Sequence, residues 1–243
     1  MSASPTRNPT AKAPTQRLAG WLPVGMLDWP GRVTTTIFLG GCDFRCPFCH
    51  NAALIETPAD PASWNGLSEH LESKRGWLDG VVITGGEPTT DPDLDRVLQL
   101  FSRMQLPVKL DTNGNNPEVL ESVLADGLVS YIALDLKTAF DRYDALTGVR
   151  NSGARVSRSV ELIIASGVPH EFRTTAYPGA IVLDDLVDIA RSVEGGDRYA
   201  VQQFVAESTL DPRASAVLPY RPDALAATVG RCNEYIPTML RGA

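Results

Sequence analysis

Long apolar runs are missing from this 243-residue chain, so no segment is expected to span a lipid bilayer as a helix. The N-terminus also lacks the charged stretch followed by an apolar core that marks a secretory signal. Basic residues are outnumbered, because 22 Lys and Arg face 29 Asp and Glu and leave a formal net charge of −7. We therefore expect a cytoplasmic protein whose main partner is neither a membrane nor a nucleic acid.

Cysteine is scarce, and its placement is uneven. Of the four cysteines, three lie between Gly40 and Asn51, in the segment GGCDFRCPFCHN. A disulfide framework would spread its cysteines along the chain, so this crowding favours another use. Cys232 stands alone in a segment expected to be helical, which is typical of a buried structural thiol.

The composition predicts one large domain with a substantial core, because 43% of the residues are hydrophobic. Residues 1–17 are rich in Pro, Ser and Thr and contain almost no large apolar side chains. Such a segment cannot bury enough surface to offset the entropy of ordering it. We therefore expect a disordered tail over residues 1–17 and a single folded domain over residues 18–243.

Short apolar or β-branched segments alternate with helical patterns along the rest of the chain. The expected strands are 33–39, 80–84, 108–110, 130–136, 170–176 and 199–205. The expected helices lie within 61–77, 91–104, 117–125, 155–166, 183–193 and 223–235. The alternation predicts an α/β fold with a parallel sheet and right-handed crossovers. Six units are too few for a closed eight-unit barrel, so we predict an open, partial (β/α)6 barrel.

Polar motifs follow four of these strands directly. The cysteine loop ends the first strand, Gly85-Gly86-Glu87 the second, Asp111-Thr112-Asn113 the third and Asp135-Leu136-Lys137 the fourth. In parallel α/β folds the carboxyl ends of the strands meet at one edge of the sheet, and the chemistry is found there. The sequence therefore predicts one site built from all four motifs.

The cysteine spacing C-x3-C-x2-C places Cys42, Cys46 and Cys49 close enough to hold a metal or an iron–sulfur cluster. A structural zinc ion usually takes four ligands in paired C-x2-C groups, and no second pair follows here. His50 is a conceivable fourth ligand, but it is adjacent to Cys49 and constrained by it. We favour a four-iron cluster with one iron left open for a small molecule, and keep zinc or reactive thiols as alternatives.

The remaining motifs suggest how such a site would hold a ligand. Gly85 and Gly86 allow a backbone carbonyl to approach it, and Glu87 is able to accept a hydrogen bond from a cationic amine. Asp135 and Lys137 alternate along their strand and point the same way. Two further expectations concern charge: Asp111 and Asp135 need a cation or Lys137 to offset them, and Arg173 needs an anionic partner.

Cys42, Cys46 and Cys49 after the first strand, with Phe48 before the last cysteine, resemble the radical S-adenosylmethionine (radical SAM) superfamily. The resemblance implies that these cysteines bind a [4Fe–4S] cluster and that S-adenosylmethionine chelates the open iron. One electron from the cluster then cleaves the cofactor into methionine and a 5′-deoxyadenosyl radical. It also implies that the backbone around Phe48 approaches the adenine, and that Gly85-Gly86-Glu87 is the "GGE" motif of the superfamily.

Two other motifs, Asp111-Thr112-Asn113-Gly114 and Asp135-x-Lys137, resemble the glycyl-radical-enzyme activating subgroup. The resemblance implies that Asp111, Asn113, Asp135 and Lys137 bind the cofactor, with a monovalent cation near Asp111 and Asp135.

The segment Asp28-x-Pro30-Gly31 is similar to a "D-G-P-G" segment of the same subgroup. The resemblance places Asp28 near the substrate, so we expect Asp28, Lys137 and Arg173 to take part in catalysis. Gln202 and Gln203 lie where pyruvate formate-lyase activators carry a histidine, which argues against that branch. The chain from Gly20 to about Leu210 looks more like the longer form of the anaerobic ribonucleoside-triphosphate reductase activating proteins.

The expected function is therefore that of an oxidoreductase that generates a glycyl radical on anaerobic ribonucleotide reductase. An electron donor such as flavodoxin or ferredoxin is implied. The alternatives are an activator of another glycyl radical enzyme, a radical SAM enzyme acting on a small molecule, and a metal-binding interaction module without enzymatic activity.

Overall fold

The computed structural model describes residues 13–57 and 62–242. They form an eight-stranded sheet in which the strands follow one another in sequence order. β1 is antiparallel to β2, and each later strand is parallel to the one before it. The strands are β1 (Leu18–Gly25), β2 (Thr34–Leu39), β3 (Gly80–Gly85), β4 (Val108–Thr112), β5 (Tyr131–Asp135), β6 (His170–Ala176), β7 (Tyr199–Gln203) and β8 (Thr238–Arg241). Within the described chain β1 and β8 do not pair with each other, so the sheet is open.

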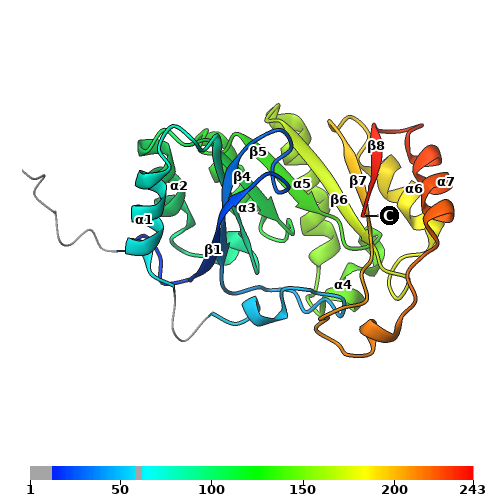
Figure 1. Ribbon diagram of the computed structural model, residues 1–243. Coiled ribbons are helices and arrows are strands. Elements are labelled where there is room, and N and C mark those ends of the chain that lie inside the picture. Colours follow the sequence, from blue (N-terminus) through cyan, green and yellow to red (C-terminus); the bar gives the residue numbers. More distant parts are fainter. Residues whose placement is uncertain (1–12, 58–61, 243) are drawn as a thin grey trace, which may run out of the picture.

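The helices lie in the connections between the parallel strands and surround the outside of the curved sheet (Figure 1). They are α1 (Trp64–Ser73), α2 (Leu94–Arg103), α3 (Pro117–Ala125), α4 (Tyr143–Thr147), α5 (Ser152–Ser166), α6 (Leu183–Ser192) and α7 (Pro222–Cys232). In α2 the residues Leu94, Val97, Leu98 and Phe101 are all buried, as helical spacing of apolar side chains requires. No helix in residues 13–57 or 62–242 has the length and apolarity to cross a membrane.

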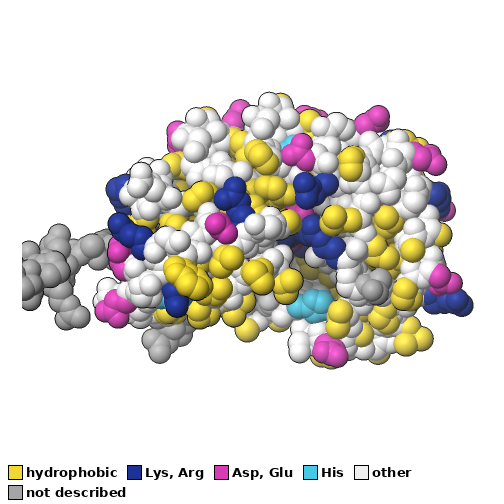
Figure 2. Space-filling view, turned by 45° about the horizontal axis from the view of Figure 1, so that its top comes forward, with side chains coloured by type: hydrophobic (Ala, Val, Ile, Leu, Met, Phe, Trp, Pro, Cys, Tyr) yellow, Lys and Arg dark blue, Asp and Glu magenta, His cyan; other side chains and the backbone are white. Residues whose placement is uncertain are grey.

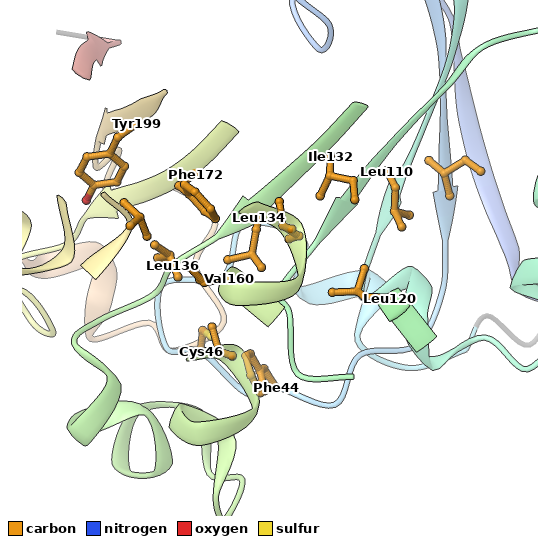
Figure 3. Close-up of a cluster of buried hydrophobic side chains, with 14 of the residues drawn as sticks. Phe44, Cys46, Leu110, Leu120, Ile132, Leu134, Leu136, Val160, Phe172 and Tyr199 are labelled. Atoms are coloured by element: carbon orange, nitrogen blue, oxygen red, sulfur yellow. The ribbon is translucent and has the colours of Figure 1, made fainter. Parts of the chain in front are cut away.

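The hydrophobic core fills the space between the sheet and these helices. Alternate residues of the strands from β2 to β7, such as Ile37, Ile83, Leu110 and Phe172, are fully buried in it. Figure 3 shows Phe44 and Cys46 of the cysteine loop at one end of this cluster. The loop is therefore anchored in the core by its own side chains.

The opposite, concave face of the sheet carries polar side chains. Paired residues of neighbouring parallel strands share a face, and Asp135 of β5 pairs with Arg173 of β6. Asp111 of β4 lies on the same face, because it pairs with Ala133, two residues before Asp135. The strand order thus places the charged residues on one surface, which ends at the cysteine loop.

The predicted open, partial barrel is confirmed, and two further strands extend its sheet. β1 and β8 were not predicted. β1 contains Pro23 and has four residues of intermediate burial and three exposed ones, so it lacks the apolar alternation that marks a strand. β8 has only four residues and directly follows the last helix region. Cys232 is fully buried, as predicted, and its thiol donates to the carbonyl of Leu186.

The expected tail, residues 1–17, lies mostly outside the described residues, which begin at Ala13. Its described end packs against the domain. Thr15 is buried and its hydroxyl donates to Asp91 at 2.7 Å, and Arg17 donates to the carbonyl of Thr90 at 3.0 Å. The packed chain therefore begins before the predicted boundary at residue 18.

Candidate active site

A pocket of about 300 Å³ opens where the parallel strands end. Its lining includes nearly every residue that the sequence predicted for the site: Cys42, Cys46, Phe48, Cys49, Gly85, Gly86, Glu87, Asp111, Asn113, Asp135, Lys137 and Arg173. The four motifs meet as the strand order requires. Figure 2 shows the molecule hollowed near the middle of one face, with basic side chains gathered there.

The cysteine loop is held by backbone and side-chain hydrogen bonds. The amide of Cys42 donates to the carbonyl of Ile55 at 2.9 Å, and Arg45 donates to the carbonyl of Cys42 at 2.7 Å. On the far side, the amide of Leu210 donates to the carbonyl of Cys49 at 3.0 Å. The loop between β7 and α7 therefore helps to fix the end of the cysteine motif.

The three thiols fit an iron–sulfur cluster. They are free, and all of them face the same pocket. Nowhere in the described chain do three Cys, His, Asp or Glu side chains converge as they would on a single metal ion. A cluster needs no such convergence, because each of its irons takes one thiolate. The three thiols on one pocket are therefore compatible with the predicted cluster.

Burial makes the thiolate forms costly without a cation. It raises the pKa of Cys42 to about 12 and that of Cys46 to about 11, although Lys137 acts in the opposite direction on Cys46. Bound iron would supply the missing positive charge, because a coordinating thiol is deprotonated by its metal.

His50 lines the pocket but has another partner. Its Nε2 atom lies 2.8 Å from the carbonyl oxygen of Val205, and its ring stacks on Phe204. His50 thus connects the cysteine loop to the segment that follows β7.

Gly85 and Gly86 allow the backbone at the end of β3 to approach the backbone of residues 39–41 closely. Gly85 has a φ of +137°, and a Cβ atom added there would lie 2.1 Å from the carbonyl oxygen of Leu39. A Cβ atom on Gly86 would lie 2.2 Å from the carbonyl oxygen of Gly41. The glycines therefore let the end of β3 pack against the cysteine loop, directly beside the pocket.

Glu87 is almost completely buried, and its carboxylate is bonded within the protein. Oε1 accepts from the amide of Thr89 at 3.0 Å and from the hydroxyls of Thr89 and Thr112 at 2.5 and 2.7 Å, and Oε2 accepts from the amide of Asn113 at 2.6 Å. Burial raises the pKa of Glu87 to about 7, despite these donors. The side chain thus joins the ends of β3 and β4, and this arrangement differs from the free acceptor expected from the sequence.

A chain of opposite charges crosses the concave face. Lys109 is fully buried and bonds to Asp111, whose other oxygen accepts from Arg173 at 3.1 Å. Nε of Arg173 donates to Asp135 at 2.7 Å, and Asp135 accepts from Lys137 at 3.1 Å. Burial alone would raise the pKa of Asp135, but Arg173 and Lys137 outweigh it and hold that pKa well below its usual range.

The sequence led us to expect a monovalent cation near Asp111 and Asp135, and the structure places a side-chain cation between these two residues. The guanidinium of Arg173 bridges the two carboxylates and supplies the positive charge that they need. The anionic partner predicted for Arg173 is therefore this pair of aspartates.

Asp28 is the one predicted site residue that does not line the pocket. It lies in the turn after β1, whose last residue Gly25 pairs with Thr34 at the start of β2. The cysteine loop leaves the opposite end of β2. Asp28 accepts instead from the hydroxyl of Thr36 at 2.5 Å. Neither β1 nor the hairpin that reverses the chain there was predicted from the sequence.

Sequence reasoning also missed Asp43, which lies between Cys42 and Phe44. Its carboxylate accepts from the side-chain amides of Asn113 at 2.8 Å and Asn115 at 2.6 Å. The run of amides after β4, NGNN, was the available signal. The side chain of Asn113 therefore holds the cysteine loop, whereas the sequence had suggested a cofactor contact.

Comparison with known proteins gives consistent results. The family model described as "Radical SAM superfamily" matches residues 36–193. A Methanocaldococcus jannaschii protein, MJ1227, provisionally named a glycyl-radical enzyme activating enzyme, is 32% identical over 212 residues, which are 80% of this chain and 82% of that protein. The pyruvate formate-lyase-activating enzyme of Streptococcus mutans is 27% identical over 186 residues, covering 70% of this chain and 69% of the enzyme.

The fold is also found in solved structures. Streptococcus suis SuiB bound to S-adenosylmethionine superposes with a TM-score of 0.60 at 19% identity, covering 83% of this chain and 48% of SuiB. This chain thus spans about half the length of SuiB. At this identity the likeness concerns the fold alone, and it agrees with the open, mostly parallel sheet described above.

Proposed function

The chain belongs to the radical SAM superfamily, and we propose that it is the activating enzyme of a glycyl radical enzyme. Members of the superfamily are enzymes that use a [4Fe–4S] cluster and S-adenosylmethionine. When bound, these two groups supply one-electron cleavage of a carbon–sulfur bond and an acceptor for a hydrogen atom. The alternative of a metal-binding interaction module without enzymatic activity is therefore not retained.

In this proposal the cluster is held by Cys42, Cys46 and Cys49. Lys137 places its ammonium group near Cys46 and Asp135. Burial works to lower the pKa of Lys137, but Asp135 and Cys46 outweigh burial and raise it, so the lysine stays charged. A charged lysine at this position would attract the carboxylate of the amino-acid part of S-adenosylmethionine.

Phe48 and the glycines of the GGE motif would shape the rest of the cofactor site. Phe48 is buried against Tyr177, with ring centroids 5.0 Å apart, and still contributes to the pocket lining. Gly85 and Gly86 keep the pocket free of side chains at the end of β3. The ring of Phe48 and the bare backbone of the two glycines would offer flat surfaces to an adenosyl group.

Arg173 would fix the two aspartates and orient the cofactor. Its planar guanidinium contacts Asp111 and Asp135 at once, which holds their carboxylates in one arrangement. The proposal contains no monovalent cation, because this guanidinium already neutralises both acids.

The observation that supports an activase best is the combination of the DTNG and D-x-K motifs in one pocket with the relationship to MJ1227. The partner that we propose is anaerobic ribonucleoside-triphosphate reductase, in the cytoplasm, with flavodoxin or ferredoxin as the electron donor. A hydrogen atom would pass from the Cα of a partner glycine to the 5′ carbon of the adenosyl group, and the unpaired electron would remain on the glycine.

The test is an anaerobic incubation of cluster-loaded protein with reductant, S-adenosylmethionine and candidate partners. Electron paramagnetic resonance should show a glycyl radical on the anaerobic reductase, and none when the partner glycine is replaced by alanine. A radical on a different glycyl radical enzyme alone would refute the choice of partner. Cofactor cleavage that consumes a small molecule, with no radical on any partner, would favour the small-molecule alternative.

A further inference from the structure

Asp43 stands inside the cysteine motif and binds a different part of the chain. Its carboxylate accepts from Nδ2 of Asn113 at 2.8 Å, of Asn115 at 2.6 Å and of Asn116 at 3.4 Å. The three amides belong to the loop between β4 and α3, about 70 residues further along the sequence. Three converging amide donors match the lone pairs of one ionised carboxylate.

The asparagines are themselves fixed. Asn113 is 6% exposed, and its Oδ1 accepts from the backbone amide of Asn115 at 2.9 Å. Asn115 is 4% exposed, and its Oδ1 accepts from Arg155 at 2.9 Å. Asn116 also donates to the hydroxyl of Thr89 at 3.0 Å. Since each amide has a second contact, the donors are oriented before they meet the carboxylate.

Asp43 is adjacent to Cys42 in the sequence, so its contacts affect the position of the Cys42 thiol. The residue before Asp43 is Cys42, and Phe44 on its other side is buried in the core. Arg45 holds the carbonyl of Cys42, and Asp43 ties the same segment to the end of β4. Besides the backbone bond of Cys42 to Ile55, the side chains of Arg45, Asp43 and Phe44 therefore hold the segment that carries this thiol. The contact of Arg45 is exposed, whereas the bonds of Asp43 are partly buried.

We propose that Asp43 is a positioning residue that fixes the Cys42 arm of the cysteine loop and keeps a negative charge beside the cluster. This inference rests on the proposed function, because it needs the cluster. Fixing a ligand from outside the coordination sphere slows its release. A negative charge next to a cluster disfavours its reduced form and makes its reduction potential more negative.

The experiment uses the full chain, reconstituted anaerobically with iron and sulfide. The variants are Asp43→Asn, which keeps the size, and Asp43→Ala, together with Asn115→Ala and the double variant Asp43→Ala/Asn115→Ala. Glu56→Gln is the matched control, because Glu56 belongs to the same connection, has a side chain that is 87% exposed and contacts Arg45. The two readouts are the rate of iron release to a chelator and the midpoint potential of the cluster.

Asp43→Ala should release iron about 10- to 100-fold faster than the unmodified chain. Both Asp43 variants should show a less negative midpoint potential, which a purely structural role would not produce. The double variant should release iron no faster than Asp43→Ala, because the two residues act through one contact. Glu56→Gln should match the unmodified chain in both measurements.

Iron release and potential in the Asp43 variants equal to those of Glu56→Gln would overturn this inference while leaving the proposed function intact. An unmodified chain that takes up no cluster would instead overturn the proposed function, and this inference with it. Circular dichroism of each variant shows whether it is folded, so that neither result is confused with unfolding.

Discussion

Glu87 gives the most detailed prediction, because its burial has a measurable consequence for stability. Its pKa rises from the ordinary value of 4.5 to about 7 in the folded chain. At about 1.4 kcal/mol per pKa unit, this difference corresponds to roughly 3 kcal/mol. A raised pKa means that the folded state holds its proton more tightly than the unfolded state does. The contribution is therefore complete below the unfolded pKa and is lost as the pH rises through the folded pKa.

Between about pH 5 and pH 8, the free energy of unfolding should fall by about 2–3 kcal/mol on account of Glu87 alone. Other groups also titrate in this range, so the comparison is with Glu87→Gln, which cannot titrate. Urea unfolding of the cluster-free, reduced chain, followed by tryptophan fluorescence, measures both curves. The stability of the unmodified chain should decrease more steeply with pH than that of Glu87→Gln.

Parallel pH profiles for the two proteins would refute the reasoning. They would mean that the hydrogen bonds from Thr89, Thr112 and Asn113 fully compensate the burial of the carboxylate. Glu87→Ala provides a second measurement at fixed pH. It leaves the amides of Thr89 and Asn113 buried without an acceptor, at about 1–3 kcal/mol each.

Three further predictions concern the pocket. Gly86→Ala should lower the free energy of unfolding by about 1–3 kcal/mol, since its Cβ would lie 2.2 Å from a carbonyl oxygen of the cysteine loop. Urea unfolding measures this change. The control is Gly20→Ala, which has open space around it and should change the free energy of unfolding little. Cofactor cleavage should not depend on K⁺ or Na⁺ in the unmodified chain but should become dependent on them in Arg173→Gln, which removes the positive charge that Asp111 and Asp135 share. Equal dependence in both proteins would contradict the bridging role of Arg173. Cys46→Ala should lose bound iron yet keep its circular dichroism spectrum, whereas His50→Ala should retain its iron. Unfolding of Cys46→Ala, or loss of iron from His50→Ala, would contradict the proposed site.

The sheet edge and its motifs could be predicted because parallel strands impose them. Cys42, Glu87, Asp111 and Asp135 each follow or end a strand, and parallel strands end at one edge whatever their side chains do. The antiparallel strand β1 follows no such rule. Its position depends on a hairpin that the sequence does not mark, so the bond between Asp28 and Thr36 could not be predicted.

The hydrogen-bond partners of the site residues were harder to predict than the part of the fold in which these residues lie. The sequence places Glu87 and Asn113 at the pocket but does not indicate which way they turn. Asp43 and Asn115 are 72 residues apart, and only the folded chain shows that they share a hydrogen bond. The bridge formed by Arg173 likewise depends on the exact register of β5 and β6. The identity of the partner enzyme stays a prediction, because the residues that line the pocket do not determine which protein docks above it.

The most direct test of the central claim is an electron paramagnetic resonance spectrum. Cluster-loaded protein, a one-electron reductant, S-adenosylmethionine and the anaerobic ribonucleotide reductase are mixed without oxygen. The account predicts a glycyl radical signal on the reductase, with methionine and 5′-deoxyadenosine formed in step with it. Cofactor cleavage without any protein radical, on this partner or on another glycyl radical enzyme, would contradict the account.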